Sequence, residues 1–169
     1  MPAERFKTFV DAAIAIALTL LILPLMDSVG EAANEHHSAG EWLVTNAGQL
    51  TSFVLSFVII AMFWRIHQSL FVRVERVDGA LQWITFAWML TIVWLPIATS
   101  VTSQLSDDTV NEALYVGSMI LTCLLTLSSR LYLRAHTGLH AFDSAELKRG
   151  ATVDLAMATL FAIALTVMI

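Results

Sequence analysis

Two ionisable side chains in apolar surroundings, Asp11 and His67, are the first candidates for chemistry in this sequence. Asp11 opens the stretch DAAIAIALTLLILPL, residues 11–25, in which Thr19 is the only other side chain with a hydrogen-bonding group. An ionised carboxylate inside a membrane costs roughly 2.5–3.5 kcal/mol unless a partner or water stabilises it. Asp11 is therefore either a proton-relay acid or part of a structural cluster, and the nearby Arg5 favours the cluster. For His67 a structural hydrogen bond is favoured over proton sensing, although an imidazole near a bilayer face can do both.

The other groups of polar residues indicate no catalytic or metal centre. Adjacent histidines in the segment from Glu35 to Glu41 lack the spacing of defined zinc sites, so a solvated loop is the better interpretation. The lone Cys123 excludes a disulfide within the chain and is expected to be a packing residue. No nucleophile, base and metal gather in any loop, so an integral-membrane enzyme is the weakest hypothesis, and we expect no cofactor.

Three further charged positions have structural interpretations. Asp154 lies near the start of an apolar segment beside Lys148 and Arg149, which indicates an ion pair at the membrane interface. Arg130 and Arg134 are four residues apart and are expected to extend toward the inner membrane face. A voltage sensor would need a longer basic series.

The elements that hold these residues are apolar segments long enough to cross a membrane. The chain has 169 residues, of which 57% are hydrophobic and 14% charged, whereas soluble domains average about 25% charged. Five stretches meet or approach the roughly 20 residues that a spanning helix needs: 6–26, 46–66, 80–102, 112–133 and 151–169. The sequence therefore predicts an all-α integral membrane protein, a single transmembrane domain over residues 1–169. The fifth stretch ends without a polar flank, which favours a sixth helix absent from these residues.

The charges separate completely by loop. All nine Lys and Arg lie at the start of the first stretch, or within or at the edge of the connections between the second and third and between the fourth and fifth. The other two connections carry only acids, among them Asp27, Asp107 and Asp108. The positive-inside rule then predicts a multi-pass protein with a cytoplasmic N-terminus, and we expect its membrane to be a bacterial-type plasma membrane. A cleaved signal peptide is the rival interpretation of residues 1–26, but Glu4 and Asp11 do not suit a basic leader.

Several smaller signals concern the ends of these helices. Pro24 and Pro96 lie near predicted outer ends and are expected to terminate helices. Trp42, Trp64, Trp83 and Trp94 fit an aromatic belt at the membrane interfaces. The longest outer connection, DSVGEAANEHHSAGEWLV, has room for a short helix ahead of the second stretch.

The first stretch has two faces. At roughly 100° per residue, Ile16, Leu20 and Leu23 share one stripe, and Asp11 is rotated by about 140° from Ile16. The stripe and the acid therefore face different neighbours. An apolar stripe on a membrane helix usually contacts lipid or another helix, so periodicity alone does not indicate a pore.

Motifs in the first three stretches resemble the transmembrane protein 175 family of potassium channels. Arg5 to Asp11, RFKTFVD, is similar to the family's RxxxFSD motif, and Ala15 to Leu23 to its A-I-x-x-T-L-L-x-L run. FWRIHQSLF at 63–71 is similar to its W-x-x-H-H-x-x-F ending. LQW at 81–83 and WLPIAT at 94–99 are similar to its LLW and LPF-x-T pieces. The resemblance covers about 100 residues.

This resemblance implies a homotetramer of six-helix subunits in which four copies of the first helix line a central pore for K⁺ and other monovalent cations. Ile16, Leu20 and Leu23 match the hydrophobic pore layers, with Ile16 at the narrowest ring, and Thr19 matches a polar position beside it. The family's structural network maps to Arg5, Phe9, Asp11, His67 and Trp83. Asp27, one turn beyond Leu23, would concentrate cations at the outer mouth.

The sequence departs from the family motifs at two positions. Val10 replaces the motif serine and Gln68 replaces the second histidine, so we expect part of the polar network to be rearranged or lost. The hypothesis is a potassium-preferring cation channel, whose partners are lipid and monovalent cations and not nucleic acid. The alternative is a proton-coupled small-solute transporter that uses Asp11 and His67.

Overall fold

The computed structural model describes residues 3–104 and 109–168, and the acids Asp107 and Asp108 lie outside them. Within these ranges the chain is helical, with elements α1 (Ala3–Leu20), α2 (Leu23–Asn34), α3 (Ala39–Thr45), α4 (Ala47–Phe71), α5 (Gly79–Gln104), α6 (Thr109–Ala135), the short 3₁₀ helix η1 (Thr137–Leu139) and α7 (Ser144–Met168). Five helical stretches are long and apolar enough to cross a membrane, α1 and α2 together counting as one. The predicted all-α membrane bundle is confirmed, and each predicted stretch overlaps one of these five.

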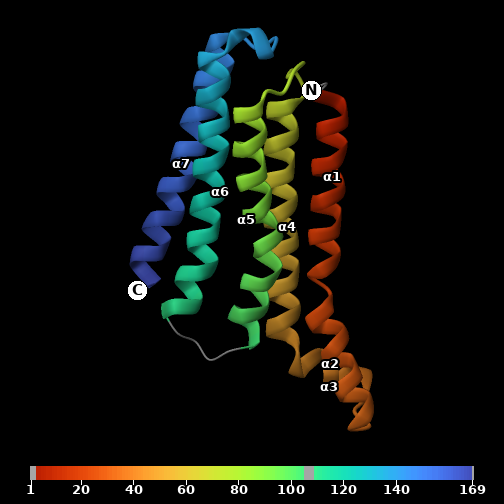
Figure 1. The fold of residues 1–169 in the computed structure, drawn as a ribbon. Helices are drawn as coiled ribbons and strands as arrows, with labels where there is room; N and C mark the ends of the chain where they lie inside the picture. The colour runs from red at the N-terminus through yellow and green to blue at the C-terminus, as the bar shows by residue number, and fades with distance from the viewer. Residues whose placement is uncertain (1–2, 105–108, 169) are drawn as a thin grey trace.

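The long helices run side by side in one helix layer (Figure 1), in which α1, α4 and α5 pack against one another and α6 and α7 continue the layer from α5. The N-terminus and the α4–α5 and α6–α7 connections share one end of this layer, whereas α2 and α3 lie at the other end (Figure 1). α1 packs on α5 and α4, α5 packs on α6, and α6 packs on α7. The segments that carry the basic residues therefore meet at the first end, which we call the basic end.

The first predicted stretch is a broken helix. α1 ends at Leu20 and α2 begins at Leu23, with Pro24 in the first turn of α2. Proline has no N–H, so Pro24 cannot donate to the Leu20 carbonyl four residues earlier. Pro24 thus interrupts the helix and does not terminate it as expected, because the chain resumes helical structure as far as Asn34.

The expectation that Pro96 terminates a helix is wrong. Pro96 lies inside α5, which continues to Gln104, and its side chain is buried. Neighbouring helices can re-satisfy a backbone that proline interrupts in a membrane bundle, and the buried position of Pro96 agrees with this.

The outer connection contains a short helix, α3, ahead of α4, as the sequence predicts. α3 begins with a capping box, in which the Ser38 hydroxyl accepts from the Glu41 N–H and the Glu41 carboxylate accepts from the Ser38 N–H. The Trp42 indole donates to the Ser28 hydroxyl at 3.1 Å. This contact ties α3 to α2, so Trp42 has a specific polar partner as well as its place near the helix end.

Candidate pore helix and its supports

The faces of α1 have opposite surroundings. Its buried side chains follow spacings of three and four residues and pack against α4 and α5: Ala3, Phe6, Val10, Ile14 and Ala17. On the other face Ile16 is 61% exposed, Leu20 39% and, at the start of α2, Leu23 52%. The described residues therefore leave more than a third of each of these side chains uncovered, and the stripe is free to meet lipid or further copies of α1.

Two polar residues lie near this stripe, Thr19 beside it and Asp27 beyond its end. The exposed Thr19 hydroxyl donates to the Ile16 carbonyl at 2.7 Å, so the helix itself satisfies this donor. Asp27 lies in α2, beside a polar groove of about 700 Å³ whose lining also includes Glu31 and Gln49. This groove presents carboxylate and amide oxygens near the α2 end of the apolar stripe.

Asp11 joins α1 to α4. Its carboxylate accepts from the Trp64 indole N–H at 2.9 Å and also from the Gln68 side-chain amide. Charge-assisted hydrogen bonds of this kind are stronger than those between neutral groups, and they explain how a carboxylate is stabilised within the helix layer. Gln68, which departs from the family motif, thus takes part in the network, and Trp64 is more than a membrane-interface anchor.

The remaining members of the predicted structural network do not reach Asp11. Among the described residues, Arg5 has no hydrogen-bond or ion-pair partner. The Phe9 ring meets Phe86 edge-on, with centroids 6.2 Å apart, and Trp83 is 74% exposed and meets Phe86 as well. The expectation of an Arg5–Asp11 cluster does not hold within this chain.

His67 lies in a different environment from Asp11, although both belong to the predicted network. Its ring is buried between Phe71 and Trp88, with ring centroids 4.2 Å away on each side. Within the described residues, His67 Nε2 and Trp88 Nε1 are buried without a hydrogen-bond partner. The expected hydrogen bond from His67 to the Asp11 cluster is absent, because His67 points from α4 toward α5 whereas Gln68 points toward α1.

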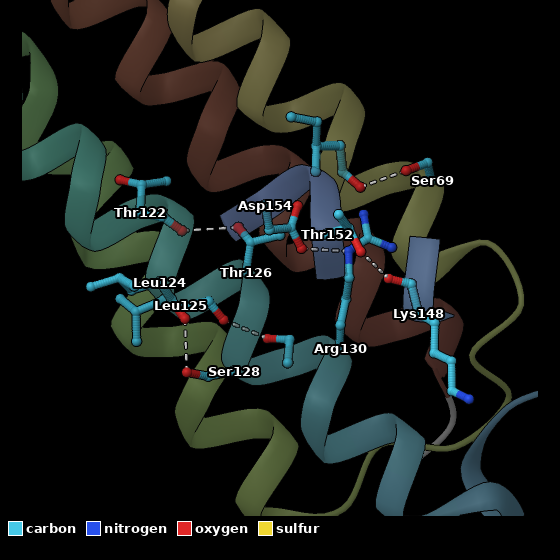
Figure 2. A network of polar contacts seen from close by, with 12 residues as sticks. Ser69, Thr122, Leu124, Leu125, Thr126, Ser128, Arg130, Lys148, Thr152 and Asp154 are labelled. Carbon is cyan, nitrogen blue, oxygen red and sulfur yellow. Dashed lines mark hydrogen bonds and ion pairs between the residues drawn. The ribbon is translucent and has the colours of Figure 1, made fainter. Parts of the chain in front are cut away.

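A buried ion pair connects α6 to α7. Arg130 Nε donates to Asp154 Oδ2 at 2.5 Å, and the two side chains are 12% and 2% exposed (Figure 2). The expected pairing of Asp154 with Lys148 and Arg149 is therefore wrong, and Arg130 does not extend toward the membrane face. A Cβ on Gly150 would come within 2.3 Å of Arg130 Nη1, so this glycine makes room for the guanidinium.

Hydroxyl groups accompany this pair along α6. Thr126 donates to the Thr122 carbonyl at 2.9 Å, as Figure 2 shows, and the Thr122 hydroxyl lies 2.8 Å from that of Thr91 on α5. Small polar residues let helices approach closely in a membrane. The polar face of α6 therefore joins α5 to α7, and Cys123 is buried within it as a packing residue.

These contacts were missed by sequence reasoning for different reasons. Arg130 and Asp154 are the basic and acidic residues deepest in their two stretches, and that shared depth is the signal that could have paired them. The hydrogen bond from Trp64 to Asp11 had no signal in the sequence. Periodicity predicts which residues share a face of a helix, but it does not predict which polar residue on that face meets a partner.

The fold is that of a membrane protein with several spanning helices, and the first of these helices has an exposed apolar face. The model of a family described as "Endosomal/lysosomal potassium channel TMEM175" matches residues 5–96, more than half of the chain. The chain belongs to the TMEM175 family of channels.

Individual relatives agree with this assignment. A potassium channel of Streptomyces collinus is 27% identical over 143 residues, which cover 82% of this chain and 67% of the relative. The endosomal/lysosomal proton channel TMEM175 of Danio rerio is 25% identical over 134 residues, 79% of this chain and 25% of the relative. The chain thus spans about a quarter of the length of the vertebrate relatives that it matches.

A solved structure supports the fold independently. The lysosomal potassium-selective channel TMEM175 homolog from Chamaesiphon minutus superposes with a TM-score of 0.78 at 18% identity, covering 98% of this chain and 86% of that one. At this identity the comparison establishes the arrangement of helices.

Proposed function

We propose that the protein is a subunit of a potassium-preferring cation channel, in which four copies of α1 surround a pore. The observation that carries this proposal is the exposed stripe of Ile16, Leu20 and Leu23 on a helix whose opposite face is packed against α4 and α5. Fourfold assembly around this stripe would cover it and would place four isoleucines at one level.

A ring of isoleucines would select cations by size and by exclusion of water. Hydrophobic constrictions gate by dewetting, and they offer no ligand to a cation. K⁺ gives up its hydration shell more readily than Na⁺, so a narrow apolar neck favours K⁺ without coordinating it, and the preference is modest. Asp27 and the polar groove beside it would raise the local cation concentration at the mouth.

The orientation and location follow from the charges. The N-terminus and the basic connections are cytoplasmic in this proposal, and α2 and α3 face outward in a plasma membrane. Support comes from the chain's own geometry, since the segments with basic residues share one end of the helix layer (Figure 1).

The alternative of a proton-coupled transporter is less well supported. It requires Asp11 and His67 to act on one pathway, but Asp11 is bonded to Trp64 and Gln68 whereas His67 is stacked between Phe71 and Trp88. Relatives are named both potassium channels and proton channels, so proton flux belongs in the same test.

The test is ion flux through the purified protein in liposomes. Wild type is compared with Ile16→Asn in K⁺, in Na⁺ and under a pH gradient. We expect K⁺ flux to exceed Na⁺ flux in wild type, and the asparagine ring to raise total flux and reduce the K⁺ preference because it keeps the neck hydrated. Leu160→Asn on α7 is the matched control, because Leu160 is 65% exposed and belongs to no proposed pore layer.

Two outcomes would contradict the proposal. If Ile16→Asn and Leu160→Asn behave alike, the stripe does not line the pathway. If neither cation passes while a pH gradient drives uptake of a solute, the transporter alternative replaces the channel.

A further inference from the structure

The two connections at the basic end are joined to each other through the backbone. Val74 and His140 form an isolated antiparallel bridge. The Glu75 N–H donates to the Leu139 carbonyl at 2.9 Å, and the Ala141 N–H donates to the Arg73 carbonyl at 3.0 Å. These bonds link the α4–α5 connection to the α6–α7 connection, so we call them the clasp.

His140 supports the clasp through both of its ring nitrogens. Nε2 lies 3.0 Å from the Leu133 carbonyl oxygen, and Nδ1 lies 3.0 Å from the Phe142 backbone nitrogen. A carbonyl only accepts and a backbone N–H only donates. The partners therefore fix one neutral tautomer, in which Nε2 carries the proton and Nδ1 presents its lone pair.

Protonation of His140 is incompatible with this arrangement. An imidazolium carries a proton on both nitrogens, so Nδ1–H would point at the Phe142 N–H and two donors would face each other. The ring would have to leave one partner, and the turn over residues 140–142 would lose the contact that closes it. Imidazoles change charge in the physiological range.

Both connections of the clasp carry charged groups. On the α4–α5 side Arg73 forms an ion pair with Glu146 and lies over the Phe142 ring, while Asp78 accepts from Tyr132. The other charged or titratable groups of these connections and adjoining helix ends are Glu75, Arg76, Arg134, His136, Asp143, Lys148 and Arg149. Among the described residues, none of the carboxylates of Glu75, Asp143 and Glu146 forms a hydrogen bond or ion pair with His140, and Glu146 already accepts from Arg73.

We propose that His140 is an acid-sensitive latch, which holds the two connections together when its ring is neutral and releases them when it is protonated. Release would loosen the α4–α5 connection from the α6–α7 connection and leave the Arg73–Glu146 ion pair and the Tyr132–Asp78 hydrogen bond to join this end of the molecule. Because α4 and α5 support α1, the latch is placed to make the packing of α1 depend on the pH at the basic end.

The test is amide hydrogen exchange of the purified full chain at pH 7.5 and pH 5.0, corrected for the intrinsic pH dependence of exchange. In wild type we expect the protection of the Glu75, Ala141 and Phe142 amides to fall about tenfold at pH 5.0, the scale of one lost hydrogen bond. His140→Asn keeps an acceptor oxygen near the position of Nδ1 and cannot be protonated. Its protection should be the same at both pH values.

His136→Gln is the matched control, because His136 lies in the same connection but its Nδ1 contacts only the Tyr132 carbonyl. This variant should respond to acid as wild type does. Unchanged protection in wild type at pH 5.0 would overturn the proposal, as would an equal fall in His140→Asn. Should the His140→Asn variant lack amide protection at both pH values, the comparison of wild type with His136→Gln decides. If wild type loses protection at pH 5.0 and His136→Gln does not, the acid response belongs to His136 and the proposal fails.

Discussion

At the scale of single residues, the Arg130–Asp154 ion pair is the contact whose loss should be most costly. Both side chains are buried between α6 and α7, and removal of one partner leaves an uncompensated buried charge, which typically costs about 3–5 kcal/mol. Asp154→Leu or Arg130→Met should each lower the thermal midpoint of the detergent-solubilised protein strongly.

The double variant Arg130→Met with Asp154→Leu supplies the control for this prediction. Apolar replacement of both members of a buried pair is often neutral or stabilising, so the double variant should melt near wild type. If the two single effects simply add in the double variant, the pair is not coupled and the prediction fails.

Gly150 permits this ion pair by lacking a side chain. In Gly150→Ala the new Cβ would lie 2.3 Å from Arg130 Nη1 and 2.6 Å from Cζ, so the guanidinium must leave Asp154. The overpacking cost of about 1–3 kcal/mol should exceed the gain of about 1 kcal/mol that alanine brings to a helix. Thermal unfolding should show net destabilisation.

A glycine on the partner helix gives the comparison. Nothing lies within 4 Å of a Cβ at Gly117 on α6, so Gly117→Ala should be neutral or slightly stabilising. Gly150→Ala should also become harmless in an Arg130→Ala background. Destabilisation that persists there would show that backbone packing, and not the guanidinium, requires the glycine.

At the scale of elements, Asp78 joins the start of α5 to the end of α6. Its carboxylate accepts from the Leu81 N–H at 3.0 Å and from the Tyr132 hydroxyl at 2.6 Å. The Tyr132 hydroxyl, and then the Leu81 N–H, hold the pKa of Asp78 below its ordinary value of 3.8. The charged carboxylate therefore stabilises the fold above pH 3.8, and that contribution is lost as the pH falls through the lower, folded-state pKa.

Asp78→Ala should destabilise the protein by about 1 kcal/mol near neutral pH, the usual cost of a lost helix cap. The difference in thermal midpoint between wild type and Asp78→Ala should shrink as the pH is lowered toward 3. Asp78→Asn keeps an acceptor for Leu81 but does not titrate, so its midpoint relative to Asp78→Ala should stay constant. A wild-type advantage that persists undiminished at pH 3 would contradict the assignment.

The elements also show what sequence patterns can predict. Hydropathy and charge predicted the five spanning stretches, because backbone groups in a membrane must be satisfied within the helix. The helix ends were less predictable: α4 runs five residues beyond its predicted end at 66, and α5 passes through Pro96. A proline ends a helix only where no tertiary packing compensates for the missing hydrogen bond, and packing is not encoded locally.

The candidate site divides in the same way. Periodicity places Ile16, Leu20 and Leu23 on one stripe of the first stretch, and the structure adds that this stripe is exposed. The supports of α1 do not follow, because neighbouring residues on α4 face different helices: Gln68 reaches Asp11 while His67 stacks on Trp88. One residue corresponds to about 100° of rotation, so a motif match alone cannot assign these contacts.

At the scale of the whole molecule, the uncovered face of α1 must meet either lipid or another copy of the chain. Exposed apolar side chains on α7 are equally compatible with lipid, so exposure alone does not separate the two. A polar anchor does not separate them either, because Asp11 ties α1 to α4 and Asp154 ties α7 to α6. The proposed channel requires copies of the chain to meet at the α1 stripe, so the two possibilities differ in which helix lies at the subunit contact.

This argument predicts a cross-link between subunits at a single level of α1. In a background with Cys123→Ala, Ile16→Cys should form dimers under mild oxidation in liposomes, because disulfides need Cα atoms within about 7 Å and the proposed narrowest ring brings adjacent copies closest. Leu160→Cys on α7 should remain monomeric under the same conditions, which excludes random collision as the cause. If Leu160→Cys cross-links and Ile16→Cys does not, α7 is the helix at the subunit contact, and the α1 stripe faces lipid.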